Sequence, residues 1–445
     1  MQNRLQLVIG IGKTGESIGR WLARHNQRFV FFDTRSEPPQ KAAIEKLFPD
    51  AALYCGLLPE SIWANIEKIY VSPGVDFRHP VMTQALKTKI PLSNDIDCLA
   101  AEIGDAQVVA ITGTNGKSTV TELVGLMAKT DQHPVVVAGN IGLPVLDQLE
   151  TAPSNALWVL ELSSFQLDLS KHLKPSATTI LNITPDHLDR HGTFANYIES
   201  KQKIYKQAQF AVYNRQDTNT YPPENVESTS FGLDKPNANQ WGIDYLDDQP
   251  YLCYGAKKIL STSSLKLKGQ HFWQNALAAS ALAHRMNISI EAITKVLSTY
   301  QGLPYRTQWV ATINQVDYIN DSKGTNVGAT QSAIQGIGST IPGKLILIAG
   351  GQGKGADFSL LQPCVKQYVK AAFIYGQDGP LLVEALKNHT QVTATSGLKE
   401  SLRHAFEIAK PGDCVLFSPA CASFDGFKDF NHRGEVFNEL VEALK

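Results

Sequence analysis

The sequence predicts an α/β protein of three domains, each built around a mainly parallel sheet. Apolar runs of strand length alternate with helical patterns along the chain, as in sheets that are covered on both faces. Two different glycine-rich loops each lie between such a run and a helical pattern. The length agrees, because at roughly 150 residues per domain a chain of 445 residues corresponds to about three domains.

The predicted strands fall into three series. The first two series comprise 5–10, 28–33 and 68–74, then 107–113, 134–140, 156–161 and 177–184. Short β-like pieces among Pro, Asn and Asp between about 210 and 270 predict hairpins at a sheet edge, and 274–301 is rich in helical pattern. The last series comprises 316–321, 344–351, 371–376 and 413–419. We therefore expect domains at 1–94, 95–302 and 303–445.

Composition excludes several classes of protein. The 41 Lys and Arg balance 42 Asp and Glu, so a main partner that is nucleic acid or an anionic membrane is not expected. No apolar run reaches the ~20 residues that span a bilayer, and the N-terminus lacks the features of a signal peptide. The six cysteines form no CxxC pair, which argues against a zinc knuckle or a disulfide scaffold. We expect a cytoplasmic, multidomain enzyme without membrane insertion.

The first glycine loop is Gly10-Ile-Gly-Lys-Thr-Gly15, with Asp33 at the end of the next predicted strand. Glycines at this spacing let the backbone approach a pyrophosphate at a helix N-terminus, where free N–H groups favour anions. On this motif alone, NAD binding and a tight turn that holds another ligand are equally supported. A second phosphate loop, and the lack of a clear hydride-transfer site, count against NAD.

The second loop, Thr112-Gly-Thr-Asn-Gly-Lys-Ser-Thr119, also joins a strand to a helix. Backbone N–H groups in such a loop hold phosphate oxygens, Lys117 neutralises phosphate charge, and the Ser118 hydroxyl can ligate Mg²⁺. The general pattern has glycine where this chain has Ile111, so it is matched in part. The loop predicts a phosphate-binding site.

Two later strand ends carry candidate metal ligands. Glu161 ends an apolar strand, and the carboxyl ends of parallel strands line the crevice in which ligands bind. Carboxylate oxygens are ligands that Mg²⁺ prefers. His187 stands between Asp186 and Asp189 after the next strand, and it is a candidate for a second metal site.

Lys201 lies at the centre of an apolar helical stripe. Apolar side chains at 194, 197, 198, 204, 205 and 208 share one face at ~100° per residue, whereas Lys203 points away from it. Burial lowers the pKa of a lysine, and the neutral amine can add CO₂ to form a carbamate that acts as a carboxylate. A lysine whose head reaches solvent is the alternative.

These motifs resemble the Mur ligases of peptidoglycan precursor synthesis, in that family's order and across essentially the whole chain. Besides TGTNGKST (112–119), Glu161 and Lys201, the matching motifs are NITPDHLDRH (182–191), GQHFWQNALAA (269–279), LPYR (303–306), NDSKGTN (320–326), AGGQGKGADF (349–358) and SPACASFDGFKDF (418–430). The late motifs are similar to those of the members that add D-glutamate. The resemblance implies a Rossmann-like N-terminal domain, a central P-loop ATPase-like domain and a Rossmann-like C-terminal domain.

The resemblance also implies an activity, its ligands and their residues. ATP would phosphorylate the carboxylate of UDP-MurNAc-L-Ala, and the amine of D-glutamate would attack the acyl phosphate. Two Mg²⁺ sites, a carbamylated Lys201 and a monomer are expected. The implied metal residues are Ser118, Glu161, His187 and Lys201, of which the last three are catalytic together with Lys117. The ATP residues are Gly113, Thr114, Asn115, Gly116, Lys117, Ser118, Thr119, Asn275, Arg306, Asp321 and Lys323. The UDP-sugar residues are Thr14, Thr34, Arg35, Ser72, Pro73, Gly74, Asn140 and Gly142, and the D-glutamate residues are Thr325, Lys354, Ser423 and Phe430.

Three alternatives remain at this point. A different ligase of the same fold would add another amino acid, or glutamate to a folate, although the late motifs favour D-glutamate. An NAD-dependent oxidoreductase would use the first glycine loop. A P-loop regulator would bind ATP without releasing phosphate in the presence of both other substrates.

Overall fold

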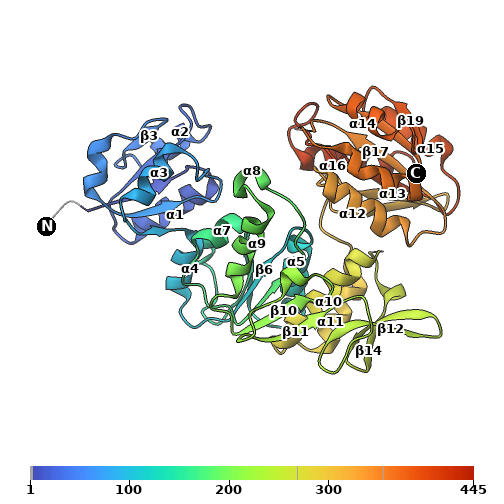
Figure 1. The fold of residues 1–445 in the computed structure, drawn as a ribbon, viewed down its shortest axis with the longest axis horizontal. Coiled ribbons are helices and arrows are strands. Elements are labelled where there is room, and N and C mark those ends of the chain that lie inside the picture. Colours follow the sequence, from blue (N-terminus) through green and yellow to red (C-terminus); the bar gives the residue numbers. More distant parts are fainter. Residues whose placement is uncertain (1–3, 268, 354) are drawn as a thin grey trace. The chain divides into compact units, whose positions relative to one another are not determined.

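The computed structural model describes residues 4–267, 269–353 and 355–445, and it contains three sheets (Figure 1). The chain folds into two compact units. The first unit comprises Met1–Gly242, Tyr254–Ala256 and Leu277–Ile293, and the second comprises Ile243–Cys253, Lys257–Ala276 and Thr294–Lys445. Within the described ranges, no helix has the length and apolar character needed to cross a membrane. The α/β class with three sheets is confirmed.

The first sheet has five parallel strands in the order β3-β2-β1-β4-β5. Its strands are β1 (Leu5–Ile9), β2 (Phe29–Asp33), β3 (Leu53–Cys55), β4 (Ile66–Val71) and β5 (Leu92–Ser93). Its helices are α1 (Lys13–Arg24), α2 (Lys41–Leu47) and α3 (Pro80–Lys87), with a 3₁₀ turn at Glu60–Asn65. The strand order reverses between β1 and β4, and ligands of open α/β sheets bind at the carboxyl ends of strands at such a point.

The second sheet has nine strands in the order β14-β13-β12-β11-β10-β9-β6-β8-β7. They are β6 (Val108–Thr112), β7 (Val135–Gly139), β8 (Leu157–Glu161), β9 (Ala177–Ile180), β10 (Phe210–Asn214), β11 (Glu227–Phe231), β12 (Trp241–Leu246), β13 (Gln249–Tyr254) and β14 (Lys257–Ser261). Asp247 and Asp248 both have positive φ between β12 and β13, as a tight hairpin turn requires. A hairpin of β12 and β13 is therefore present near the sheet edge. The prediction was wrong for β10 and β11, which pair in parallel with β9 and with each other.

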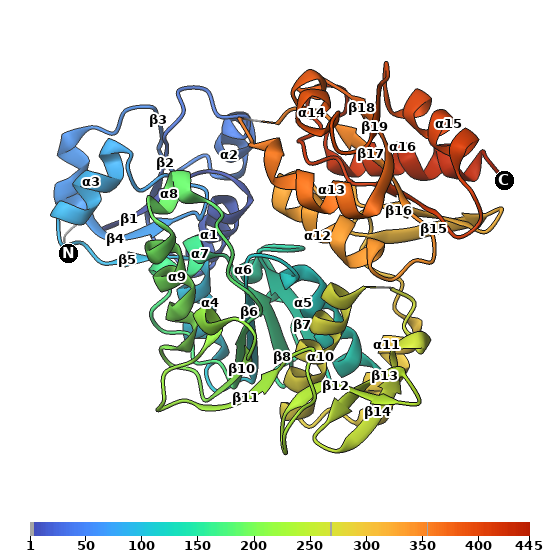
Figure 2. The ribbon, with the colours of Figure 1, turned by 45° about the vertical axis from the view of Figure 1, so that its right-hand side comes forward.

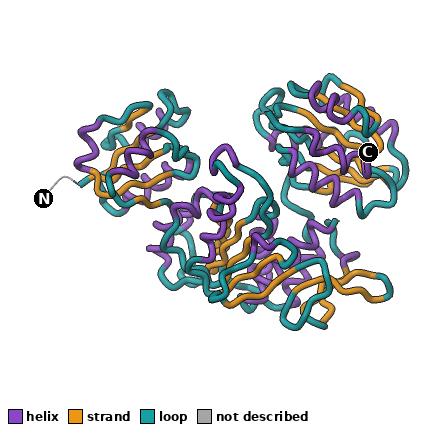
Figure 3. The backbone as a smooth tube through the Cα atoms, in the orientation of Figure 1, coloured by secondary structure: helices purple, strands orange, loops and turns teal. Residues whose placement is uncertain are grey.

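Helices pack on this sheet (Figure 3). The helix that follows the phosphate loop contacts β7 and β8. The helices are α4 (Asp95–Ile103), α5 (Lys117–Thr130), α6 (Val145–Gln148), α7 (Ser164–Leu169), α8 (Leu188–His191), α9 (Phe194–Gln202), α10 (Gln270–Arg285) and α11 (Ile290–Thr299), with 3₁₀ turns at Lys203–Tyr205, Thr218–Thr220 and Thr262–Ser264. All five residues of β6 and all five of β8 are buried. Such burial on both faces explains why these strands read as unbroken apolar runs.

The third sheet has the order β15-β16-β20-β17-β18-β19, and β15 is its antiparallel edge strand. The strands are β15 (Gln308–Ile313), β16 (Val316–Asn320), β17 (Leu345–Gly350), β18 (Val369–Tyr375), β19 (Gln391–Ala394) and β20 (Cys414–Phe417). The helices are α12 (Val327–Gly338), α13 (Gln362–Tyr368), α14 (Gly379–Leu386), α15 (Leu398–Ile408) and α16 (Phe430–Glu442), with a 3₁₀ turn at Phe358–Leu361.

Each face of the third sheet has its own core. Leu345 and Leu347 of β17 belong to the cluster with α12, α13 and α14, whereas Ile346 and Ile348 belong to the cluster with α15 and α16 (Figure 2). Alternate residues of a strand point to opposite faces, so a strand covered by helices on both faces is apolar along most of its length.

Asp95, the first residue of α4, makes stability depend on pH. Burial raises the pKa of its carboxyl to about 6 from an ordinary value of 3.8. The folded chain therefore keeps this proton to a higher pH than the unfolded chain does. Its contribution to stability is complete below about pH 4 and is lost as the pH rises through 6.

We expect Asp95→Asn to remove this dependence. Between pH 4 and 7 the free energy of unfolding of the unchanged protein should fall, relative to that of the variant, by on the order of 2–3 kcal/mol. Urea unfolding of both proteins at several pH values measures the difference, in which contributions from other carboxyl groups cancel. Parallel pH profiles would contradict the assignment.

Candidate active site

The phosphate loop joins β6 to α5. Gly116 has φ of +84° at the N-terminus of α5, where most other residues would be strained. A Cβ on Gly113 would lie 3.0 Å from Cβ of Leu181. The Lys117 ammonium donates to the carbonyl oxygens of Gly113 and Thr114, at 3.0 and 2.9 Å. The loop thus places a cation at the N-terminus of a helix, an arrangement that suits phosphate oxygens.

The segment after β9 holds this loop in place. The Asn182 side chain accepts from the Asn115 backbone N–H at 2.9 Å and donates to the Asn115 carbonyl at 3.1 Å. The Thr184 N–H donates to Oγ1 of Thr114 at 3.0 Å, and the Tyr197 hydroxyl lies 3.3 Å from the same oxygen. Asn182 and Tyr197 were not among the predicted site residues, although both lie in segments that carry predicted ones.

Glu161 ends β8 with a buried carboxylate that is only half satisfied. Its Oε1 accepts from Nδ2 of Asn140 at 2.9 Å, whereas its Oε2 is buried and has no hydrogen-bond partner among the described residues. A buried carboxylate oxygen without a donor is costly, and Mg²⁺ binds such oxygens. Glu161 therefore fits a metal ligand. Among the described residues, no three His, Cys, Asp or Glu side chains lie close enough together to bind a metal ion on their own. Oxygens of hydroxyl groups, phosphates or water would therefore have to complete the coordination.

Lys201 is buried on α9 with 2 % of its surface exposed, as the apolar stripe predicts. Its Nζ donates to the Gly113 carbonyl at 2.8 Å and lies 4.7 Å from the centre of the Tyr197 ring. Burial, followed by repulsion from Lys117, holds the pKa of Lys201 well below its usual value. Lys203, by contrast, pairs with Asp168 at the surface.

His187 differs from Glu161 in exposure. Half of its side chain is exposed, its Nε2 lies 3.8 Å from Asp186, and its ring meets the edge of Phe165. His191, which sequence reasoning did not select, stacks on Phe165 and contacts the Ser164 hydroxyl at 3.0 Å. Burial lowers the pKa of His191, so that it is held neutral more readily than an exposed histidine.

The first glycine loop lies at the carboxyl ends of β1 and β4. Gly10 has φ of +90°, and the Ser72 hydroxyl donates to its carbonyl at 2.8 Å. A Cβ on Gly15 would lie 1.8 Å from the same carbonyl oxygen, so glycine is required there. The other predicted UDP-sugar residues of this sheet follow β1, β2 or β4 closely: Thr14, Thr34, Arg35, Pro73 and Gly74. The remaining two, Asn140 and Gly142, follow β7.

Asp33 is engaged by the protein itself. Its Oδ2 accepts from the Ile11 N–H at 3.1 Å, and the guanidinium of Arg35 donates to Oδ1 and Oδ2 at 2.8 and 3.0 Å. Burial opposes ionisation of Asp33, but Arg35 and the backbone donors outweigh it and hold the pKa of Asp33 low. A dinucleotide ribose would have to compete for this carboxylate, which counts against the NAD alternative.

In the second unit, Asp321 follows β16 and is buried. Its Oδ1 accepts from the Thr307 N–H at 3.0 Å and its Oδ2 from the Ser418 hydroxyl at 2.6 Å, and burial raises its pKa to about 6. The Lys323 ammonium lies 4.6 Å from the centre of the Phe430 ring, so a predicted phosphate residue and a predicted D-glutamate residue touch.

The other predicted residues of this unit are placed as follows. The Thr325 N–H donates to the Lys323 carbonyl at 2.8 Å, and Ser423 is buried in the loop after β20. Arg306 precedes β15, and Asn275 lies on α10. Lys354 lies outside the described residues.

Arg433 is the main residue of the second unit that sequence reasoning missed. It is fully buried on α16, and its guanidinium donates to the Ser322 carbonyl at 2.8 Å and to the Cys421 carbonyl at 3.1 Å. It thereby ties the 321–325 segment to the loop that carries Ser423. Helical periodicity in the sequence could have found it, because Arg433 shares a helical face with the buried Phe437 and Val441.

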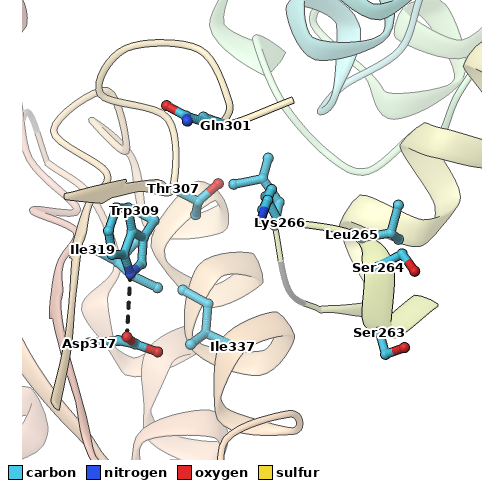
Figure 4. Close-up of a pocket in the computed structure, with 11 residues that line it drawn as sticks. Ser263, Ser264, Leu265, Lys266, Gln301, Thr307, Trp309, Asp317, Ile319 and Ile337 are labelled. Carbon is cyan, nitrogen blue, oxygen red and sulfur yellow. Dashed lines mark hydrogen bonds between the residues drawn. The ribbon is translucent and has the colours of Figure 1, made fainter. Parts of the chain in front are cut away.

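A cavity of ≈ 510 Å³ lies in the second unit (Figure 4), and its lining includes Thr307, which follows Arg306 and whose N–H donates to Asp321. Trp309, Ile319 and Asp317 line one side of it, and the Trp309 indole N–H donates to Asp317 at 3.3 Å. Residues 263–267 contribute to its lining as well. No predicted ATP or D-glutamate residue is among the described side chains that line it.

Family models match three consecutive parts of the chain. Residues 4–94 match the Mur ligase MurD-like N-terminal domain, 111–283 the Mur ligase middle domain, and 305–421 the Mur ligase glutamate ligase domain. The UDP-N-acetylmuramoylalanine–D-glutamate ligase of Legionella pneumophila strain Paris is 49 % identical over 448 residues, covering 100 % of both chains. The enzyme of the same name from Pseudomonas aeruginosa is 42 % identical over 444 residues, covering 99 % of this chain and 98 % of its own.

Solved structures of lower identity share the fold. The UDP-N-acetylmuramate–alanine ligase MurC of Thermotoga maritima aligns with a TM-score of 0.60 at 18 % identity, covering 99 % of this chain and 100 % of its own. MurF ligase of Thermotoga maritima in complex with ADP aligns with a TM-score of 0.59 at 16 % identity, covering 100 % of this chain and 99 % of its own.

Proposed function

The chain belongs to the Mur ligase family, and from that premise we propose that it joins D-glutamate to UDP-N-acetylmuramoyl-L-alanine in an ATP-dependent reaction of peptidoglycan precursor synthesis. The observation that carries this proposal is identity of 49 % over the whole chain to a ligase of that name. The phosphate loop, the half-satisfied Glu161 and the buried Lys201 supply the groups that such a reaction needs.

The reaction proceeds through an acyl phosphate. A carboxylate oxygen of the L-alanyl end attacks the γ-phosphorus of ATP, and ADP leaves. The amine of D-glutamate then attacks the acyl carbon, loses a proton and expels phosphate, so that an amide bond forms. Catalysis of phosphoryl transfer is largely positioning and charge stabilisation. Lys117 and the backbone of Gly113–Gly116 bind the phosphates of ATP, together with Ser118 and Thr119.

Mg²⁺ fits this site because Glu161 offers a buried carboxylate oxygen without a donor among the described residues. Ser118 and Glu161 would hold one ion, and His187 with the carbamate of Lys201 would serve a second. The metal would supply neutralisation of phosphate charge.

We propose that Lys201 carries a carbamate. Its lowered pKa provides the neutral amine, whose lone pair attacks CO₂; an N–C bond forms and a proton leaves to solvent. The product places an anion next to Lys117, so that a second buried ammonium beside Lys117 is avoided.

The remaining ligands are assigned by family resemblance. Asn275 approaches the adenine, Asp321 the ribose, and Arg306 and Lys323 the phosphates. The D-glutamate carboxylates are bound by Thr325, Lys354 and Ser423 beside Phe430. UDP lies at the first glycine loop, at Thr14, Thr34 and Arg35, and the muramoyl group follows Ser72, Pro73, Gly74, Asn140 and Gly142. Domains at 1–94, 95–302 and 303–445, a monomeric state and a cytoplasmic location complete the proposal.

Phosphate release tests the function directly. The protein, ATP, Mg²⁺ and UDP-MurNAc-L-Ala are mixed with single amino acids of both configurations, and phosphate and ADP are measured. Release that depends on both the sugar peptide and D-glutamate is expected. Release with L-amino acids only, or none with D-glutamate, would overturn the proposal. Stabilisation of the fold by NAD, but by neither ADP nor UDP, would favour the oxidoreductase.

A further inference from the structure

Arg20 joins helix α1 to helix α6 within the first unit. Its Nε donates to Oδ1 of Asp147 at 3.0 Å and its Nη2 to Oδ2 at 2.6 Å, and the Ser17 hydroxyl donates to the same carboxylate at 2.9 Å. The side chains of Arg20 and Asp147 are only 35 % and 22 % exposed. A bidentate pair that is partly shielded from water holds its geometry better than an ordinary surface ion pair.

The surrounding contacts strengthen this junction. Ile18 and Leu22 of α1 share a core cluster with Val145 and Leu146 of α6. The guanidinium of Arg24 donates to the Leu146 carbonyl at 3.0 Å. The apolar contacts are not directional, whereas the bidentate pair fixes how α6 is oriented on α1.

The two helices lead to two different parts of the proposed substrate path. Helix α1 begins at Lys13, directly after Gly12 of the first glycine loop. Helix α6 begins at Val145, shortly after Asn140. Asn140 in turn donates two hydrogen bonds to Glu161: its backbone N–H donates to the Glu161 carbonyl at 2.8 Å, and its Nδ2 donates to the carboxylate at 2.9 Å.

We propose that Arg20 is a positioning residue that fixes the first glycine loop relative to Asn140 and Glu161. The inference rests on the proposed function, in which UDP lies at the glycine loop and the muramoyl group extends to Asn140, which holds Glu161. A ligand that spans two subsites binds more tightly when their separation is fixed, because its second end then meets its subsite at high effective concentration. Arg20 itself touches neither end of the ligand.

The test compares a ligand that spans both subsites with one that fills a single subsite. Dissociation constants for UDP-MurNAc-L-Ala and for UDP are measured by calorimetry with the full chain, for the unchanged protein and for Arg20→Ala. The exposed pair Arg4–Glu67 on the first sheet provides a matched control, Arg4→Ala. We expect Arg20→Ala to weaken binding of UDP-MurNAc-L-Ala by roughly tenfold while UDP binding changes less than about twofold. Arg4→Ala should change neither.

A double-mutant cycle separates the ion pair from general damage to the fold. Asp147→Ala removes the other half of the pair, so it should weaken binding of UDP-MurNAc-L-Ala to a similar degree, and Arg20→Ala added to it should cost little more. Equal weakening of both ligands by Arg20→Ala, no weakening of either, or fully additive losses in the double variant would overturn the proposal. If the unchanged protein binds neither ligand, the proposed function fails instead.

Discussion

A Lys201→Ala chain is expected to fold and to lose roughly 10³-fold in kcat, because the proposed carbamate anion beside the phosphate loop could not form. In the structure the Lys201 and Lys117 ammonium groups both donate to the Gly113 carbonyl, at 2.8 and 3.0 Å. Two cations at this distance repel each other. The phosphates of ATP bring negative charge to the same loop, and that charge must be balanced there. A carbamate on Lys201 would turn this repulsion into attraction and offer oxygen ligands to Mg²⁺.

The neighbouring lysine on the same chain segment gives the control. Lys203→Ala removes an ammonium that pairs with Asp168 at the surface, and it should leave kcat within about twofold. ¹³C-labelled bicarbonate should give a protein-bound carbamate resonance in the unchanged protein and in Lys203→Ala, and none in Lys201→Ala. Full activity of Lys201→Ala, or no such resonance in the active unchanged protein, would refute the carbamate.

Glu161→Gln is expected to lower kcat by roughly 10²- to 10³-fold and to raise the Mg²⁺ concentration needed for half-maximal activity. Glutamine has nearly the same size and can still accept from Asn140, so the packing at the end of β8 is kept. The change removes the negative charge and replaces the unpartnered oxygen by an amide or a neutral carbonyl. The loss should therefore appear in the metal dependence and not in stability.

Measurement of ADP formation against Mg²⁺ concentration checks this expectation. Glu199→Gln, on the exposed side of α9, serves as the matched control and should leave the curve unchanged. If Glu161→Gln shifted only the temperature of unfolding and kept the Mg²⁺ curve of the unchanged protein, Glu161 would not be a metal ligand.

The sequence predicted the central strands better than the edge strands. All five residues of β6 and of β8 are buried, and each strand is apolar up to its last residue, Thr112 or Glu161, so both are easily recognised. Strand β3 has only three residues, β5 has two, and β19 (Gln391–Ala394) lies at a sheet edge with exposed ends. Such strands depend on pairing with a neighbour, which leaves little trace in local hydrophobicity.

The site shows the same division between local and distant signals. Burial of Lys201 followed from helical periodicity within its own segment, and the same reasoning applied to α16 would have found Arg433. The hydrogen bonds between Asn182 and Asn115 join residues that are 67 positions apart in the sequence. They arise because β6 and β9 are neighbours in the sheet, a pairing that no local pattern encodes.

Lys201 and Lys117 lie close together at the Gly113 carbonyl, and their charges are therefore coupled. Since both ammonium groups donate to one oxygen, any change in the charge of Lys201 alters the field in which Lys117 meets a nucleotide. Linkage is reciprocal. If addition of CO₂ raises the affinity for ATP by some factor, ATP must raise the affinity for CO₂ by the same factor. Binding of nucleotide to the loop and retention of the carbamate on Lys201 would then be one coupled equilibrium.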